Sequence, residues 1–162
     1  MNETLRIRNA EPYEASYLSE LAIRSKSYWG YSAKFMAACR NELVVSIEKI
    51  ENEYFHYMAA ERQGEVVGFY ALEHLSESDF ELEALFVEPR YIGTGIGKAL
   101  ISHAKSNAAS LGGDTLIIQG DPNAEKFYLA AGGRLTGKRE SASILSRFLP
   151  TFSISLANED VA

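Results

Sequence analysis

A glycine-rich run at residues 93–97, Gly-Thr-Gly-Ile-Gly, constrains the fold of this chain more than any other feature. It follows a segment that predicts a strand, residues 80–87, and Pro89 ends that pattern. It precedes a predicted helix, because apolar residues recur at every third or fourth position from Ile96 to Leu111. The first N–H groups of a helix have no internal acceptor, so this junction predicts an anion site made of backbone groups.

The segments before this run predict helices followed by an antiparallel meander. Strands are predicted at residues 5–8, 57–61, 66–75 and 80–87, and helices at residues 12–29 and 35–40. Gln63-Gly64 is a turn signal between two of these strands and predicts a hairpin. Residues 41–53 fit both a strand end and a helix.

The segments after the glycine run complete a mixed fold. Asp121 is a candidate N-cap of a further helix, the second after the glycine run, with Pro122 at its first position. The remaining strands are predicted at residues 115–119, 135–138 and 152–156. This order predicts a mixed α/β fold with a central, largely antiparallel twisted sheet of about seven strands, flanked by about four helices.

Composition narrows the class of protein. The 162 residues suggest one domain over residues 1–162, and an apolar fraction of 46% argues against disorder. The net charge of −6 gives no support to a nucleic-acid partner and weakly favours a cationic substrate. The single cysteine, Cys39, is expected to pack as a small apolar residue, and no Cys/His spacing predicts a metal site. No signal-peptide or membrane-spanning stretch is visible, so a cytoplasmic location without membrane contact is expected.

Three phosphate-binding patterns compete for the glycine run. A Walker loop needs Ser or Thr after Gly97-Lys98, where Ala99 stands. A Rossmann fingerprint needs its third glycine at residue 98 or 100, and neither is glycine. The pattern Gln/Arg-x-x-Gly-x-Gly/Ala is matched literally by residues 90–95, Arg-Tyr-Ile-Gly-Thr-Gly.

Two segments resemble the signatures of the GNAT superfamily of acetyl-CoA-dependent N-acetyltransferases. Residues 85–100, LFVEPRYIGTGIGKAL, resemble its acetyl-CoA loop; residues 121–128, DPNAEKFY, followed by Gly132-Gly133, resemble its second signature. The element order also resembles that fold across nearly the whole chain. The resemblance implies acetyl transfer from acetyl-CoA, as co-substrate and without a metal, to a primary amine of an unidentified acceptor in a ternary complex. A non-catalytic acyl-CoA-binding module on the same fold is the alternative, and a homodimer is one expectation for its assembly.

One position departs from the family pattern. Aligned on the Gly95-Ile96-Gly97 end of the loop, the Gln/Arg position falls on Ile92 and not on Arg90. A polar side chain that usually braces the loop would then be missing. The backbone donors of residues 93–98 do not need it, so pyrophosphate binding is expected to survive.

The resemblance assigns roles to specific residues of the cofactor site. Tyr128 would protonate the leaving thiolate, and Asn123 would hydrogen-bond the CoA arm or cap its helix. Leu85, Phe86 and Val87 would pair through their backbone with the pantetheine amides, and an N–H near Phe86 or Val87 would polarise the acetyl carbonyl. The loop residues expected at the pyrophosphate are Ile92, Gly93, Thr94, Gly95, Ile96, Gly97 and Lys98.

Glu81 and Glu83 are candidates for the base that deprotonates the amine. A free lysine-like amine has a pKa of ~10.4, so it must lose a proton before or during attack. Strand alternation predicts that both carboxylates share one face with Leu85 and Val87. Burial or the neighbouring carboxylate would raise a pKa toward the working range. Solvated carboxylates and ligands of the substrate amine are the alternatives.

The acceptor site is expected between residues 25–55 and the loop at about 139–150. The aromatic run at residues 28–31, Tyr-Trp-Gly-Tyr, either lines this site or packs the first helix onto the sheet. His56, His74 and His103 form no Ser/His/Asp pattern, and no nucleophile elbow supports hydrolase chemistry.

Overall fold

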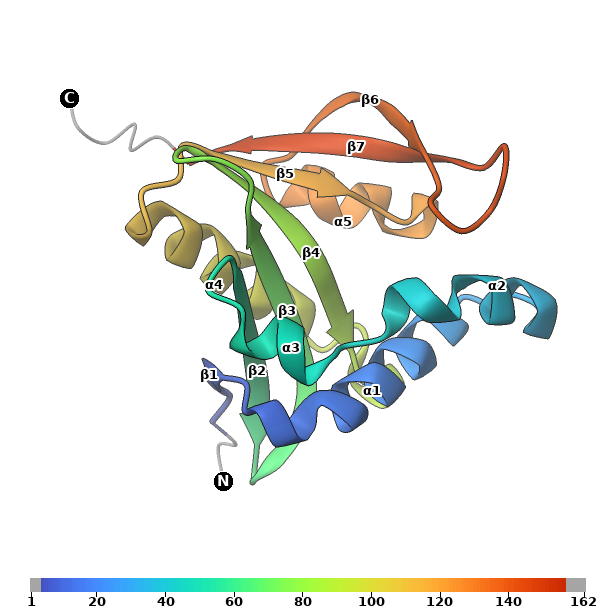
Figure 1. Ribbon diagram of the computed structural model, residues 1–162, viewed down its shortest axis with the longest axis horizontal. Coiled ribbons are helices and arrows are strands. Elements are labelled where there is room, and N and C mark those ends of the chain that lie inside the picture. Colours follow the sequence, from blue (N-terminus) through green and yellow to red (C-terminus); the bar gives the residue numbers. More distant parts are fainter. Residues whose placement is uncertain (1–3, 157–162) are drawn as a thin grey trace.

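The computed structural model describes residues 4–156, in which seven strands form one sheet in the order β1-β2-β3-β4-β5-β7-β6 (Figure 1). The strands are β1 (Arg6–Asn9), β2 (Phe55–Arg62), β3 (Glu65–His74), β4 (Asp79–Val87), β5 (Thr115–Gln119), β6 (Arg134–Glu140) and β7 (Phe148–Ser155). In this part of the chain β4 and β5 pair in parallel, and every other neighbouring pair is antiparallel. The predicted mixed α/β fold with a largely antiparallel sheet is confirmed.

The α-helices are α1 (Ala15–Ser27), α2 (Ala33–Leu43), α3 (Ile47–Glu51), α4 (Ile96–Ser110) and α5 (Glu125–Ala130). Short 3-10 turns, η1 (Pro12–Glu14), η2 (Pro89–Tyr91) and η3 (Pro122–Ala124), each begin at a proline. The ambiguous stretch at 41–53 contains the end of α2 and then α3, which begins after Ser46, whose side chain accepts from the Lys49 N–H. No helix within residues 4–156 is long and apolar enough to cross a membrane.

Two apolar cores cover the two faces of the sheet. The first lies against α4 and α5. The apolar residues predicted at every third or fourth position from Ile96 onward pack in this core. The second lies against α1 and α2 and includes the fully buried Cys39. Figure 1 shows α4 behind the sheet and α1 to α3 in front of it. Both helical layers therefore hold the central strand β4 from opposite sides.

β4 and β5 separate halfway along β4. They pair only from Asp79 to Leu82, opposite Thr115 to Ile118, and beyond this point β4 continues beside β3 alone. Figure 1 shows the ends of the two strands diverging. The second half of β4 therefore has one open backbone edge in the middle of the sheet.

A β-bulge at Glu83 corrects one sequence prediction. The β3–β4 register shifts between Ala71 and Leu72, and Glu83 is the extra residue. A bulge reverses the alternation of side chains beyond it. Leu82 and Leu85 consequently both pack in the core beneath α4. Because of this reversal, the prediction that Glu81 and Glu83 share a face with Leu85 and Val87 is wrong.

Candidate active site

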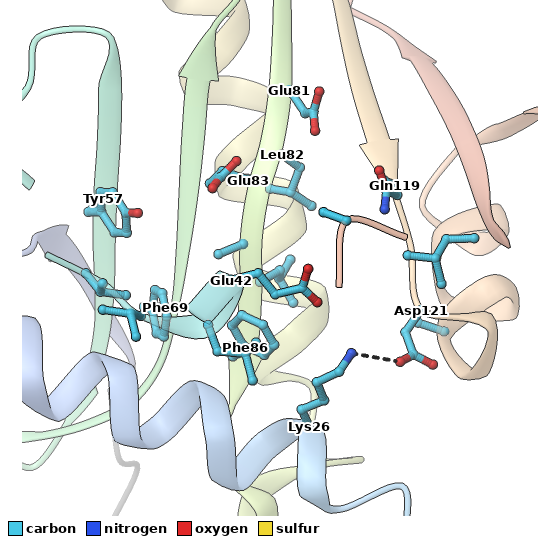
Figure 2. Close-up of a pocket in the computed structure, with 18 of the residues that line it drawn as sticks. Lys26, Glu42, Tyr57, Phe69, Glu81, Leu82, Glu83, Phe86, Gln119 and Asp121 are labelled. Carbon is cyan, nitrogen blue, oxygen red and sulfur yellow. Dashed lines mark hydrogen bonds and ion pairs between the residues drawn. The ribbon is translucent and has the colours of Figure 1, made fainter. Parts of the chain in front are cut away.

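Two cavities meet where β4 and β5 separate. The first, which we call the carboxylate cavity, has a volume of about 340 Å³ and contains the side chains of Glu81 and Glu83 (Figure 2). The second, the loop cavity, has a volume of about 370 Å³ and lies against the glycine run. Leu85, Ala124 and Tyr128 line both. Two molecules, one in each cavity, would therefore meet at these three residues.

The loop cavity is built on the N-terminus of α4. Gly93 and Gly95 have φ values of +86° and +95°, left-handed values that favour glycine. The first backbone bond of the helix runs from the Ala99 N–H to the Gly95 carbonyl. The N–H groups of residues 96–98 precede this bond and have no acceptor within the helix. They lie where Gly97 and Lys98 line the cavity, which suits a phosphate group.

Of the two positions considered for the side chain that braces the loop, Ile92 lies at the loop cavity and Arg90 does not. Ile92 packs against the core beneath α4 and also lines the loop cavity. Arg90 forms an ion pair with Glu65 and lies over the Tyr91 ring, 5.0 Å from its centroid. Arg90 is therefore engaged outside the loop cavity, and the loop is held by its backbone and by Ile92.

The open edge of β4 presents the backbone groups of alternate residues. The Val87 N–H donates to Ser25 Oγ at 3.3 Å, so it faces away from β3. The Glu88 N–H bonds to β3 instead, as strand alternation requires. By the same alternation the Leu85 backbone faces the open side and the Phe86 backbone faces β3. Ser25, which also lines the loop cavity, is a site residue that sequence reasoning missed.

Tyr128 lies on α5 at the boundary of both cavities and is 8% exposed. Burial, and then the charge of Asp121, raises its pKa. Its hydroxyl has no hydrogen-bond partner among residues 4–156. Gly120 makes room for its ring, since a Cβ there would lie 3.0 Å from ring carbons. A protonated, unengaged hydroxyl at this boundary has the properties of a proton donor.

The carboxylate cavity brings Glu81 and Glu83 together with two cations. Arg139 Nη1 lies 3.4 Å from Glu81 Oε2, and Lys49 Nζ lies 3.4 Å from Glu83 Oε1. Glu73 of β3 lies opposite Glu81 in the sheet. Burial, and then the charges of Glu83 and Glu81, raises the pKa of Glu73. This end of the cavity is therefore rich in carboxylates.

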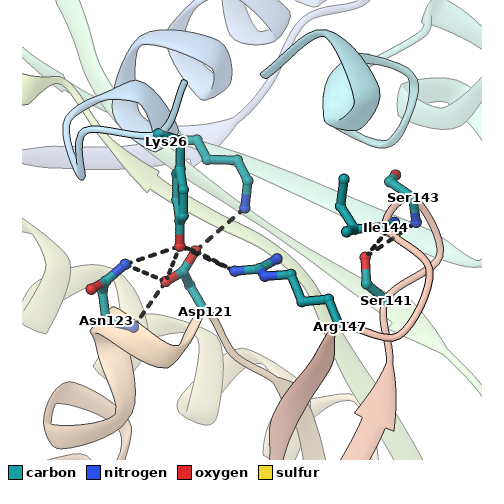
Figure 3. A network of polar contacts seen from close by, with 8 residues as sticks. Lys26, Asp121, Asn123, Ser141, Ser143, Ile144 and Arg147 are labelled. Atoms are coloured by element: carbon teal, nitrogen blue, oxygen red, sulfur yellow. Dashed lines mark hydrogen bonds and ion pairs between the residues drawn. The ribbon is translucent and has the colours of Figure 1, made fainter. Parts of the chain in front are cut away.

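Asp121 is the centre of a polar network at the other end of the carboxylate cavity (Figure 3). It accepts hydrogen bonds from the Tyr31 hydroxyl at 2.8 and 2.9 Å and from the Asn123 N–H at 2.8 Å. Lys26 Nζ lies 3.4 Å and Arg147 Nη2 3.7 Å from Asp121 Oδ2. We call these five residues the Asp121 cluster. It joins α1, the α1–α2 segment and the β6–β7 segment to the start of η3.

The ionisation of the Asp121 cluster follows from these contacts. Burial opposes the charge of Asp121, but hydrogen bonds from the Asn123 backbone and the Tyr31 hydroxyl hold its pKa below the usual range. Burial and the bond to Asp121 raise the pKa of Tyr31 to about 12. The Asn123 side-chain amide donates to Tyr31 and to Asp121, and Asn123 also lines the loop cavity. The capping role predicted for Asp121 is confirmed.

The segments expected to hold the acceptor do reach the carboxylate cavity. Lys26, Glu42 and Lys49 come from the first, and Ala142 and Leu149 come from the second. The residues of the aromatic run at 28–31 lie in different places. Trp29 lines the loop cavity, and Tyr31 belongs to the Asp121 cluster. Tyr28 and Trp29 are 53% and 44% exposed, so they do not pack α1 onto the sheet.

The histidines lie outside both cavities. His103 Nδ1 lies 2.7 Å from the hydroxyl of the fully buried Tyr70, and burial lowers the pKa of His103. The His56 and His74 rings lie 6.2 Å apart. Their contacts are structural and support no hydrolase centre.

Residues 16–146 match the family described as acetyltransferase (GNAT) domain. Peptidyl-lysine N-acetyltransferase YjaB of Escherichia coli is 31% identical over 104 residues, 64% of this chain and 66% of that protein. Its Salmonella typhimurium counterpart is 34% identical over 105 residues, with the same shares covered. The chain thus spans slightly less than two thirds of the length of these curated relatives.

Solved structures show the same fold. The PaiA N-acetyltransferase of Thermoplasma acidophilum in complex with coenzyme A superposes with a TM-score of 0.75 and 19% identity, over 94% of this chain and 99% of that one. An aminoglycoside 6'-N-acetyltransferase complexed with coenzyme A superposes with a TM-score of 0.72 and 19% identity, over 94% of this chain and 98% of that one. At such identities the likeness concerns the fold alone.

Proposed function

This chain belongs to the GNAT acetyltransferase family, and from that premise we propose that it transfers an acetyl group from acetyl-CoA to a primary amine while both substrates are bound. The observation that carries the proposal is the meeting of two cavities at Tyr128, one against a phosphate-binding loop and one lined by carboxylates. The proposal includes a single domain over residues 1–162 and a cytoplasmic location.

The residues of the loop cavity fit acetyl-CoA. The N–H groups at the start of α4 suit its pyrophosphate, and Lys98 adds a positive charge. The open backbone of Leu85 suits the amides of its pantetheine arm, because an extended chain can pair with a free strand edge. Coenzyme A in two solved structures of the same fold gives further support.

The reaction follows from the groups at the junction. The acceptor nitrogen forms a bond to the acetyl carbon, the carbon–sulfur bond breaks, and the sulfur takes a proton from the Tyr128 hydroxyl. The N–H that polarises the acetyl carbonyl was expected near Phe86 or Val87, but the Val87 N–H donates to Ser25 Oγ and the Phe86 backbone faces β3. The Leu85 N–H faces the open edge instead and would stabilise charge on the acetyl oxygen. The amine proton passes to Glu81 or Glu83, directly or through water. The Asp121 cluster holds the segment that carries Tyr128.

The acceptor is a primary amine that reaches the junction through the carboxylate cavity. The name of the two enterobacterial relatives, peptidyl-lysine N-acetyltransferase, makes a lysine side chain one acceptor to test. A free amine is cationic near neutral pH, and the carboxylates would attract it before it loses its proton.

Isothermal titration of the protein with acetyl-CoA tests the cofactor assignment, with ATP and NAD as controls. We expect selective, micromolar binding of acetyl-CoA. Binding of ATP in its place would assign the loop to a nucleotide. Absence of any binding would mean that the glycine run is only a turn, and Ile92 would be the first residue to replace.

Gly95→Ala is expected to weaken acetyl-CoA binding about tenfold. A side chain at φ +95° is strained by about 1–2 kcal/mol, and relieving the strain moves the N–H groups at the start of α4. Gly112→Ala is the matched control, because Gly112 has the same φ at the other end of α4 and lies outside the loop cavity. Both variants should lose similar stability, and equal loss of acetyl-CoA binding in both would contradict the loop assignment.

A further inference from the structure

Carboxylates outnumber cations in the lining of the carboxylate cavity, where Glu42, Glu81, Glu83 and Asp121 stand against Lys26 and Lys49. At one end Glu83 pairs with Lys49 and Glu81 pairs with Arg139, and Glu73 lies beside them outside the lining. Both ion pairs are long, at 3.4 Å, and the Lys49 and Arg139 side chains are 39% and 48% exposed. Exposed pairs of this kind hold weakly. An incoming cation could therefore displace either one.

Tyr57 provides a second, independent sign of a ligand at this end. It is 5% exposed, and its ring lies 6.4 Å from that of Phe69. Its hydroxyl points into the cavity (Figure 2), and no residue in the described range 4–156 forms a hydrogen bond with it. Burial, and then the charges of Glu83 and Glu73, raises its pKa, so it is a neutral donor and acceptor. Because Tyr57 lines the cavity, its hydroxyl oxygen is available to accept a hydrogen bond from an ammonium group that enters.

The spacing along β4 separates this end from the point of reaction. Acetyl transfer is proposed at Leu85 and Tyr128, and Glu83 and Glu81 lie two and four residues earlier on the strand. Because Glu83 is the bulged residue, Leu85 and Glu81 lie opposite Tyr70 and Glu73, which are three residues apart on β3. At ~3.3 Å per residue the Cα atom of Glu81 therefore lies roughly 10 Å from that of Leu85, with Glu83 between them. The rings of Phe69 and Phe86 line the cavity beside this stretch. They offer an apolar surface to a methylene chain.

On the basis of the proposed function, we infer that the acceptor is a diamine or polyamine. One amine reacts at Leu85 and Tyr128 and passes its proton through water to Glu81, and a second ammonium group binds Glu83, with Tyr57 as a further ligand. The two nitrogens of a four-carbon diamine are roughly 6 Å apart, since five single bonds of about 1.5 Å form a zigzag. This distance between the two nitrogens is similar to the distance along β4 from Leu85, where transfer is proposed, to Glu83.

The test compares putrescine with butylamine, which has the same carbon chain and a single amine. Release of coenzyme A is measured over a range of each amine at saturating acetyl-CoA. We expect kcat/KM for putrescine to exceed that for butylamine at least about tenfold, because a charge-assisted contact is made only by the diamine. N-α-acetyl-lysine amide, which has no second cation, should behave like butylamine.

Three variants locate the second ammonium group. Glu83→Gln should lower kcat/KM for putrescine about tenfold more than for butylamine, and Tyr57→Phe should reduce the preference by a smaller factor. Glu48→Gln, an exposed residue beside Lys49 on α3, should keep the wild-type preference. A general base removed at Glu83 would instead lower both rates by the same factor.

The outcomes separate the inference from the proposed function. Equal rates with both amines, or faster transfer to the lysine amide, would overturn the diamine assignment and leave the acetyltransferase intact. A preference that survives in both Glu83→Gln and Tyr57→Phe would overturn the assignment of these residues. No release of coenzyme A with any amine would overturn both.

Discussion

Replacing Tyr128 by phenylalanine is expected to lower kcat about a hundredfold or more, with little change in the affinity for acetyl-CoA. Tyr128 lines both cavities, and no described residue forms a hydrogen bond with its hydroxyl. The ring itself packs between Phe127 and Phe152 and is kept in the variant. Single-turnover kinetics at saturating acetyl-CoA, with titration of the cofactor beside it, measure both quantities.

Tyr70→Phe is the matched control for this variant. Tyr70 is also buried, but its hydroxyl contacts His103 and Asn107, away from both cavities. It should lose about 1–2 kcal/mol of stability and keep its kcat. If Tyr128→Phe kept the wild-type kcat under conditions in which chemistry limits the rate, Tyr128 would not be the acid.

Replacing Asp121 by asparagine is expected to lower the free energy of unfolding by about 3–5 kcal/mol at pH 7. The change leaves Lys26 and Arg147 without their carboxylate, and these side chains are only 12% and 17% exposed. Urea unfolding followed by circular dichroism measures the loss. Asp114→Asn, at an exposed position, should change stability by no more than about 0.5 kcal/mol.

The same variant should alter the response of stability to acid. The folded-state pKa of Asp121 is lowered, so between the two pKa values the unfolded chain binds more protons than the folded one. The stabilisation is present above the unfolded value of about 3.9 and is lost as pH falls through the folded value. The difference between wild type and Asp121→Asn should therefore shrink toward strongly acid pH. A constant difference would assign the effect to packing and not to charge.

Local signals predicted the order of the helices and strands and the glycine loop of the candidate cofactor site. The glycine run, the helix stripe from Ile96 and the turn at Gln63-Gly64 act within a few residues, so their patterns could be read directly. Tyr128 and Asn123 followed from a family resemblance, and the structure places both at the loop cavity.

The acceptor side depends on contacts between distant segments, and sequence reasoning reached it only in outline. The bulge at Glu83 arises from pairing with β3 and reversed the predicted alternation. The contacts of Asp121 with Lys26, Tyr31 and Arg147 join residues far apart in the chain, and no local spacing indicates them. The sequence did not predict Tyr57 as a site residue, because a tyrosine in a strand is typical of an ordinary core position.

The most direct test of the central claim is to incubate the protein with acetyl-CoA and a panel of amines, and to measure thiol release together with the mass of each amine product. We predict an N-acetylated amine formed in step with free coenzyme A, both lost in Tyr128→Phe. Acetyl-CoA binding without transfer to a small amine, a lysine peptide or a polyamine would contradict this account and identify a non-catalytic acyl-CoA-binding module.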